Sequence, residues 1–189
     1  DLFAGIGGIR KGLELAIKDS GNNPVCVFTS EIKPHAISIL KQNNPNDEIT
    51  GDITSVDESK IPDFDILCAG FPCQAFSAAG KREGFGDTRG TLFFDVERIL
   101  KAKKPKGFIL ENVEGLVNHD GGKTLEIILK HLNKIGYKVN YKVLNSKDFG
   151  IAQDRKRIYI VGTFNNFVDL ENFPQSSSVL KDILEKGKQ

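Results

Sequence analysis

DLFAGIGG, at residues 1–8, places three glycines where a short apolar stretch gives way to a helical pattern. Glycines at positions 5, 7 and 8 allow a tight turn and let a ligand approach the backbone amides at the start of a helix. The spacing is G-x-G-G rather than the G-x-G-x-x-G of dinucleotide-binding proteins, so a purely structural turn stays an open alternative. We expect Asp1–Phe3 to be the end of a central strand that is truncated in this sequence.

Beyond this turn, short apolar runs alternate with stretches of helical period, which is typical of a parallel sheet covered by helices. The predicted strands are 25–30, 65–70, 107–113, 137–144 and 157–162, and the predicted helices are 34–42, 91–103 and 123–135. The last two strands can pair as a ribbon. The predicted fold class is therefore α/β: a doubly wound, mostly parallel, Rossmann-like sheet with a truncated first strand.

The composition is that of one globular domain. The 189 residues are 39% hydrophobic and 27% charged, which excludes a disordered tail, and no apolar run approaches the ~18 residues of a membrane span. None of the three cysteines forms a C-x-x-C pair, which disfavours a disulfide framework or a metal site and fits a reducing, cytoplasmic setting. The net charge of +1 is uneven: residues 1–94 hold 9 Lys/Arg against 13 Asp/Glu, and residues 95–189 hold 17 against 12. The basic excess in residues 95–189 can reflect a function, and a chance distribution of charges on a solvated surface is the alternative.

Two acidic residues, Glu31 and Asp52, are candidates for a nucleoside pocket. Glu31 follows the strand at 25–30, where a carboxylate can accept both ribose hydroxyls of a nucleoside; an ordinary Glu favoured by the dipole of the next helix is the alternative. Gly51-Asp52-Ile53 can place a carboxylate and an apolar side chain beside an adenine ring, and a plain turn is the alternative. Together with the glycine turn, these features predict a pocket for an adenosyl cofactor.

A thiol follows the predicted strand at 65–70 directly. Cys73, in GFPCQAFS at 70–77, lies just past the carboxyl end of that strand, the edge at which open α/β sheets bind ligands. A basic neighbour or a helix N-terminus would lower the pKa of this thiol and make it a nucleophile. Cys26 and Cys68 lie within predicted strands and are expected to be small buried side chains.

Charged residues at two later positions complete the candidate chemistry. Glu111-Asn112-Val113 ends the strand at 107–113, and an acidic residue there suits a proton donor to a substrate heteroatom; a capping or ion-pairing Glu is the alternative. Arg155 and Arg157 are two residues apart, project to one face of a strand and suit a phosphate or a planar base edge. A solvated charge run on an edge strand is the alternative there. None of the three histidines has a comparable position, which disfavours a Cys–His hydrolase.

The successive motifs DLFAGIGG, GDIT, GFPCQAFS, GTLFFD, ENV and QDRKRIYIVG resemble those of the DNA (cytosine-5) methyltransferases, GTLFFD being similar to the bacterial members. The resemblance extends from Asp1 to about Gly162, and the combination of Pro-Cys-Gln with Glu-Asn-Val is its most specific part. It implies a sheet of the S-adenosylmethionine-dependent methyltransferase type, with S-adenosylmethionine as cofactor.

The resemblance also implies roles for individual residues. Cys73 is the expected nucleophile and Glu111 the expected acid, with Arg155 and Arg157 holding the active-site loop and the target base. The cofactor would be bound by residues of the turns and strand ends: Phe3, Gly5, Ile6, Gly8, Glu31, Ile32, Asp52, Ile53, Gly70 and Leu92. Residues around the nucleophile would bind the substrate: Pro72, Gln74 and Ser77.

In the reaction that the resemblance implies, attack of the Cys73 thiolate at C6 would make C5 of cytosine nucleophilic, while Glu111 would stabilise the charge that develops at N3. The methyl group then transfers to C5, a base removes the C5 proton, and elimination releases the thiol. The target base must leave the duplex for this chemistry, so base flipping is expected in double-stranded DNA.

Residues 1–164 are expected to form a catalytic domain that is incomplete at both ends, with 165–189 leading to a missing target-recognition region. A cognate restriction endonuclease and a second chain that completes the enzyme are open as partners. Two alternatives stay open for function: methylation of cytosine in tRNA, and a non-catalytic remnant that binds only DNA or a partner chain.

Overall fold

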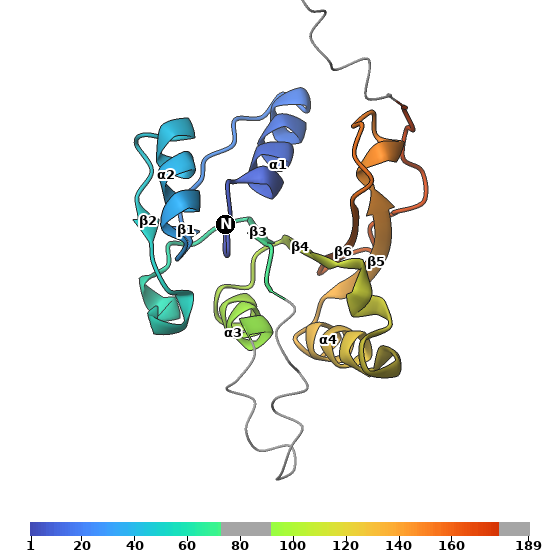
Figure 1. Cartoon of the computed structure of the whole chain (residues 1–189). Helices are drawn as coiled ribbons and strands as arrows, with labels where there is room; N and C mark the ends of the chain where they lie inside the picture. Colours follow the sequence, from blue (N-terminus) through green and yellow to red (C-terminus); the bar gives the residue numbers. More distant parts are fainter. Residues whose placement is uncertain (73–91, 178–189) are drawn as a thin grey trace, which may run out of the picture.

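The computed structural model describes residues 1–72 and 92–177, which form a sheet with helices on both faces. Figure 1 shows α1 and α2 on one face of the sheet and α3 and α4 on the other. The four helices are α1 (Gly8–Asp19), α2 (Pro34–Asn43), α3 (Leu92–Lys103) and α4 (Lys123–Lys134). Within the described ranges, no helix combines the length and the apolar character needed to cross a membrane.

Among the described strands, all except β6 run in the same direction, so the sheet is mostly parallel, as predicted. Its strands are β1 (Thr29–Ser30), β2 (Ile49–Thr50), β3 (Ile66–Ala69), β4 (Gly107–Val113), β5 (Lys138–Asn145) and β6 (Lys156–Thr163). β1 pairs with β2 and β3 with β4 in parallel, whereas β6 is antiparallel to both β4 and β5. The last two strands therefore form the predicted ribbon.

Leu2 joins the two parallel pairs, because it bridges Ser30 on one side and Ala69 on the other. Its amide donates to the Cys68 carbonyl at 2.8 Å, and its carbonyl accepts from the Gly70 amide at 3.3 Å. The spatial order is thus β2-β1-Leu2-β3-β4-β6-β5. The predicted strand end at residues 1–3 is confirmed.

The glycine turn after Leu2 needs unusual backbone angles. Phe3 has a φ of +52° and Gly5 a φ of +56°, in the region that most side chains avoid. Gly7, with a φ of +87°, precedes the first residue of α1, and a Cβ there would lie 3.1 Å from Cδ2 of Leu40 in α2. The turn therefore brings the start of α1 close to α2, which only a glycine at position 7 permits.

The core lies between the sheet and the α3–α4 face. α3 and α4 bury one apolar stripe each against the central strands, as their helical spacing predicts. The buried side chains include Phe93, Val96, Ile99, Leu100, Leu125, Ile128 and Leu132, facing Phe108, Leu110, Ile158 and Ile160. Phe108 stands opposite Gly162 in the β4–β6 ladder, and a Cβ at Gly162 would lie 2.4 Å from the Phe108 ring.

The strand predicted at 25–30 is wrong in its first four residues, since only Thr29–Ser30 pairs. The Asp1 amine donates to the Phe28 carbonyl at 2.8 Å, directly before the first paired residue, Thr29. Without a ladder partner among the described residues, Val25 is 74% exposed. Cys26 is accordingly half-buried instead of buried, whereas Cys68 is buried within β3 as predicted.

Candidate active site

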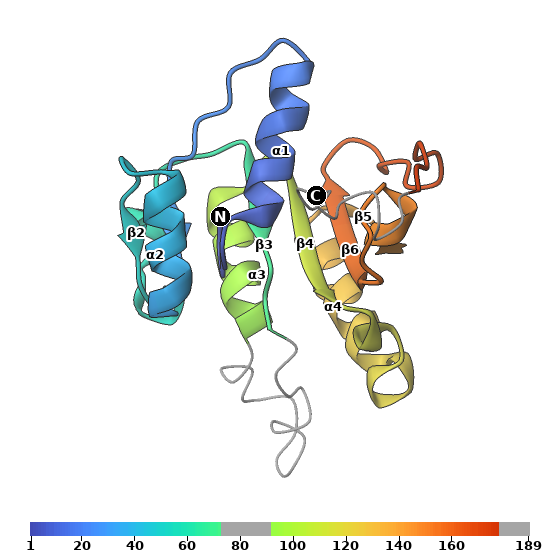
Figure 2. The same ribbon diagram turned by 45° about the horizontal axis from the view of Figure 1, so that its top comes forward.

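Most of the described candidate residues gather at one edge of the sheet, where Leu2, β1, β3 and β4 end. In Figure 2 this is the lower edge, toward which β3 and β4 run. The turn at Phe3–Gly8 lies at this edge, together with Glu31, Gly70 and Glu111 from the following strand ends. In open α/β sheets ligands bind outside this edge.

Glu31 is a buried carboxylate that ties the glycine turn to the start of α2. It is 6% exposed, and its Oε2 accepts from the Gly5 amide at 2.7 Å. Its Oε1 accepts from the amides of Ile32 and Lys33 at 2.9 and 2.8 Å. Because a carboxylate has about four acceptor positions, these three bonds leave capacity for one more donor, such as a ribose hydroxyl.

The three isoleucines predicted to line the cofactor pocket differ in the exposure of their side chains. Ile6 and Ile32, on either side of the Gly5–Glu31 contact, are 58% and 63% exposed. Ile53, in contrast, is buried and belongs to the core. A ligand can therefore touch the side chains of Ile6 and Ile32, while the side chain of Ile53 anchors its turn.

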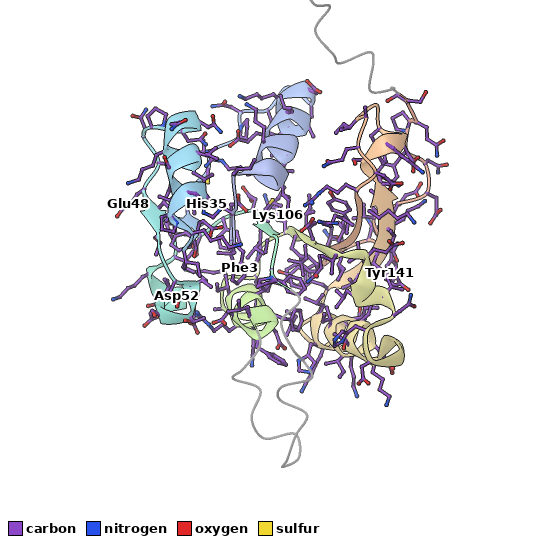
Figure 3. All side chains as sticks on the ribbon, viewed as in Figure 1. Phe3, His35, Glu48, Asp52, Lys106 and Tyr141 are labelled. Atoms are coloured by element: carbon purple, nitrogen blue, oxygen red, sulfur yellow. The ribbon has the colours of Figure 1, made fainter. Side chains whose placement is uncertain are left out.

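Asp52 is exposed and caps the short 3-10 helix Ile53–Ser55. Its Oδ1 accepts from the amide and the hydroxyl of Thr54 at 2.9 and 2.8 Å. Figure 3 labels Asp52 at this 3-10 segment and Phe3 nearer the centre of the sheet. The side chain is thus held by its own turn at a position open to a ligand.

Gly70 is the position where the glycine turn and Glu111 meet. A Cβ at Gly70 would lie 3.6 Å from Oε2 of Glu111, 3.7 Å from Cδ1 of Ile9 and 3.7 Å from the Phe3 carbonyl oxygen. The absence of a side chain keeps this space open between the candidate cofactor turn and the candidate acid. The residues predicted for cofactor binding and for catalysis are therefore within contact distance of one another here.

Glu111 is held by the two arginines of the late ribbon through a single oxygen. Nε of Arg157 lies 3.0 Å and Nη2 of Arg155 lies 3.7 Å from Oε1 of Glu111. The β4–β6 ladder sets Glu111 opposite Tyr159, so Arg157 is the diagonal neighbour on the same face. Burial, and then the charge of Glu111, raises the pKa of Tyr159.

Arg155 reaches Glu111 by a different route from the predicted one. It precedes β6, which begins at Lys156, so strand alternation does not place its side chain. Its amide donates to Oδ1 of Asn145 at 3.1 Å, which fixes the backbone just before the strand. Its side chain is 50% exposed, against 23% for Arg157, so Arg155 is the more open of the two.

Sequence reasoning missed Asn112, which fixes the residues that lead to the thiol. Its side chain is buried, its Nδ2 donates to the Phe71 carbonyl at 2.9 Å, and its Oδ1 accepts from the Val113 amide at 2.8 Å. A polar residue at a buried position of an otherwise apolar strand was the signal that could have revealed it.

Three candidates, Cys73, Gln74 and Ser77, lie outside the described residues. The described chain reaches Pro72, which is exposed, and resumes at Leu92, which is half-buried. Phe71 is buried, and its ring lies 5.9 Å from that of Phe93 in α3. The two ends of the interval are thus anchored to β4 and α3.

Two further features lie apart from this edge. A groove of about 700 Å³ opens between residues 24–28 and the start of β3, and none of the candidate residues lines it. Within residues 1–72 and 92–177, no group of three His, Cys, Asp or Glu side chains is arranged to hold a metal ion.

Solved structures share this fold. The chain superimposes on a DNMT2 mutant from Spodoptera frugiperda with a TM-score of 0.75 and 23% identity, covering 100% of this chain and 59% of the other. Dnmt2 of S. pombe gives a TM-score of 0.70, also at 23% identity, over 96% of this chain and 53% of the other. The sheet and its ligand edge define the fold class of the S-adenosylmethionine-dependent methyltransferases.

The family is shown by sequence. Residues 1–189 match the profile of the C-5 cytosine-specific DNA methylases, and the chain belongs to this family. It is 61% identical to Type II methyltransferase M.NlaIV of Neisseria lactamica over 99% of this chain and 46% of that protein. Identity to M.HhaI of Haemophilus parahaemolyticus is 46%, over 97% of this chain and 55% of that protein. The chain spans about half the length of these curated relatives.

Proposed function

We propose that the protein containing this chain transfers a methyl group from S-adenosylmethionine to C5 of cytosine in double-stranded DNA. One observation carries the proposal: Glu111 is fixed by Arg157 and lies against Gly70, from which the Phe71–Pro72 segment leads into Cys73. The similarity to Type II methyltransferases over nearly the whole chain supports it.

The residues at the sheet edge fit the proposed cofactor. The open space at Gly70 and the turn at Gly5–Gly8 leave room beside the start of α1, and Glu31 retains an acceptor for a ribose hydroxyl. Asp52 and Leu92 would border the adenine. The cofactor would be bound by Phe3, Gly5, Ile6, Gly8, Glu31, Ile32, Asp52, Ile53, Gly70 and Leu92. It would supply an electrophilic methyl sulfonium.

The two oxygens of Glu111 take different roles in the proposed reaction. Oε1 faces the arginines, while Oε2 faces the space at Gly70. Oε2 is therefore the oxygen that would exchange a proton with N3 of a flipped cytosine, and Arg157 would keep the carboxyl group in that orientation. Arg155, which is more exposed, would contact the target base or the loop around it.

Cys73 would form the covalent bond to the substrate. Its thiolate would add to C6 of cytosine, and C5 would take the methyl group as the bond between that methyl and the cofactor's sulfonium sulfur breaks, which leaves a neutral thioether. Transfer of the C5 proton to a base would then expel the thiolate and restore the ring. Pro72, Gln74 and Ser77 would position the cytosine around this thiol. Asn112 would set the approach of Cys73 by holding the Phe71 carbonyl.

Further proposals concern the setting of this activity. Residues 1–164 would form the catalytic part, and 165–189 would lead to the region that recognises the target sequence. A restriction endonuclease of the same specificity, a second chain that completes the enzyme, and a cytoplasmic location belong to this proposal as well.

A trapping experiment tests the proposed function. Duplex DNA containing 5-fluorocytosine is incubated with the protein and S-adenosylmethionine, and covalent complexes are resolved on a denaturing gel. Because fluorine blocks loss of the C5 substituent, we expect a stable complex that Cys73→Ser abolishes and Cys68→Ser preserves. An undiminished adduct with Cys73→Ser would contradict the nucleophile. A parallel incubation with tRNA distinguishes the alternative substrate, and methylation of tRNA alone would contradict the DNA proposal.

A further inference from the structure

The turn at residues 51–55, which carries Asp52, is fixed from both sides by side chains outside the candidate site. From β1, the Ser30 hydroxyl donates to the Gly51 carbonyl at 2.6 Å. From α3, Nη2 of Arg98 donates to the Ile53 carbonyl at 2.6 Å. The turn therefore depends on two hydrogen bonds to elements that are distant in sequence.

Arg98 uses its guanidinium to join three segments. Besides the Ile53 carbonyl, its Nη1 donates to Oε2 of Glu58 at 2.7 Å and its Nε donates to Oδ1 of Asp95 at 2.9 Å. Glu58 belongs to a second 3-10 helix, Glu58–Lys60, and Asp95 lies one helical turn before Arg98 in α3. A planar, always charged guanidinium is suited to such simultaneous contacts, whereas a lysine is not.

The position of Asp52 follows from this contact. The Ile53 side chain is buried in the core, and its carbonyl accepts from both Arg98 and the Val56 amide, the latter at 3.1 Å. The side chain and the carbonyl of Ile53, the residue that follows Asp52, are therefore both fixed. Leu92, the first residue of α3, belongs to the same helix as Arg98. Arg98 thus sets the separation between the Asp52 turn and α3, the two elements proposed to border the adenine.

We propose that Arg98 is a positioning residue for adenine recognition: through the Ile53 carbonyl it holds Asp52 where its carboxylate accepts a hydrogen bond from the 6-amino group of the cofactor. This inference rests on the proposed cofactor. It adds a residue that acts through the backbone of the turn and has no role in the transfer of the methyl group.

The test compares two ligands that differ only at the base. Binding of S-adenosylhomocysteine and of S-inosylhomocysteine, which has a carbonyl in place of the 6-amino group, is measured by calorimetry on the protein that contains this chain and on its variants. The unsubstituted protein should prefer the adenosyl ligand. In Arg98→Met we expect this preference to fall about tenfold, the equivalent of one charge-assisted hydrogen bond, while affinity for the inosyl ligand stays nearly constant.

Two variants separate positioning from a general loss of structure. Arg98→Lys keeps the charge but reaches fewer acceptors, and we expect it to restore part of the preference. Lys103 lies in α3 with Arg98 but is away from the turn. Lys103→Met removes its 3.3 Å ion pair with Asp63 and should leave the preference for the adenosyl ligand unchanged.

Each outcome bears on the inference. An equal loss of affinity for both ligands in Arg98→Met, or an unchanged preference, would overturn the positioning role and leave the proposed cofactor intact. Failure of the unsubstituted protein that contains this chain to bind S-adenosylhomocysteine would overturn both.

Discussion

Glu31 and Glu111 are both acidic residues at the carboxyl ends of strands in one sheet, yet their surroundings differ. Glu31 is bonded to three backbone amides, from the glycine turn and from the start of α2. Glu111 contacts two guanidiniums through one oxygen, and its other oxygen faces the space at Gly70. The first carboxylate holds backbone amides, whereas the second keeps one oxygen free of an ion pair among the described residues and directed toward Gly70. We therefore expect substitutions at the two glutamates to have different effects.

The largest effect is expected for Glu111→Gln. The amide keeps the shape of the side chain but cannot donate a proton, so methyl transfer should fall by about 10²–10⁴-fold. Thermal unfolding should change little, because the carbonyl oxygen of the new amide can still accept from Arg157. Methylation is measured with radiolabelled cofactor and the melting temperature by circular dichroism. A variant that melts much earlier would assign Glu111 a structural role instead.

Glu31→Gln should reverse this pattern. One amide nitrogen would face backbone donors in a buried position, which we expect to reduce the free energy of unfolding by about 2–3 kcal/mol. Cofactor affinity should fall along with stability, because the glycine turn loses its anchor. Urea unfolding measures the first effect and calorimetry the second. Unchanged stability would show that the Gly5 amide finds another acceptor and would contradict the comparison.

The two arginines should differ in their effects on Glu111. Arg157→Gln removes the closer contact and should lower methylation by about tenfold, the equivalent of one charge-assisted hydrogen bond. Arg155→Gln removes a 3.7 Å contact and should affect the orientation of Glu111 less. The KM for DNA, measured for both variants, tests whether Arg155 acts on the substrate. Equal losses in kcat would show that the two contacts are equivalent.

The smallest effect concerns Cys68, which lies behind this edge in β3. Burial raises the pKa of Cys68 to about 11 from its ordinary 9.0, so the folded state keeps its proton where the unfolded chain has lost it. Below about pH 9 the thiol is protonated in both states, and the free energy of unfolding keeps its full value. As the pH rises toward 11, only the unfolded chain loses the proton, so the free energy of unfolding should fall. Urea unfolding of Cys68→Ala, compared with the parent chain between pH 8 and 11, measures it. Iodoacetamide should also modify the half-buried Cys26 before Cys68, and the reverse order would contradict the burial.

Local patterns were sufficient where an element is buried on both faces. β4 was predicted with the observed bounds, because a short, mostly apolar run without alternation between two helical stretches is typical of a strand covered on both sides. The segment at 25–28 is equally apolar, but within the described residues only Thr29 and Ser30 pair with a neighbouring strand. A strand requires a paired neighbour as well as an apolar composition, and local composition does not show whether that neighbour is present.

The sequence motifs predicted which edge of the sheet carries the candidate site, but not the hydrogen bonds that fix its backbone. Glu31, Gly70 and Glu111 could be chosen from their places after strands, and their contacts now connect the cofactor turn with the candidate acid. Arg98 and Asn112 could not be assigned in this way. Each acts on a carbonyl at least 41 residues away in sequence, a contact that local periodicity does not encode.

Gly162 has a consequence for the accuracy of folding. A shift of the β4–β6 pairing by one residue would put a side chain against the Phe108 ring, since only Gly162 leaves room for it. The same shift would turn Arg157 away from Glu111 and bring Ile158 to its face. A glycine at one end of the ladder therefore favours the observed alignment of the whole ribbon, and with it the position of an arginine five residues away.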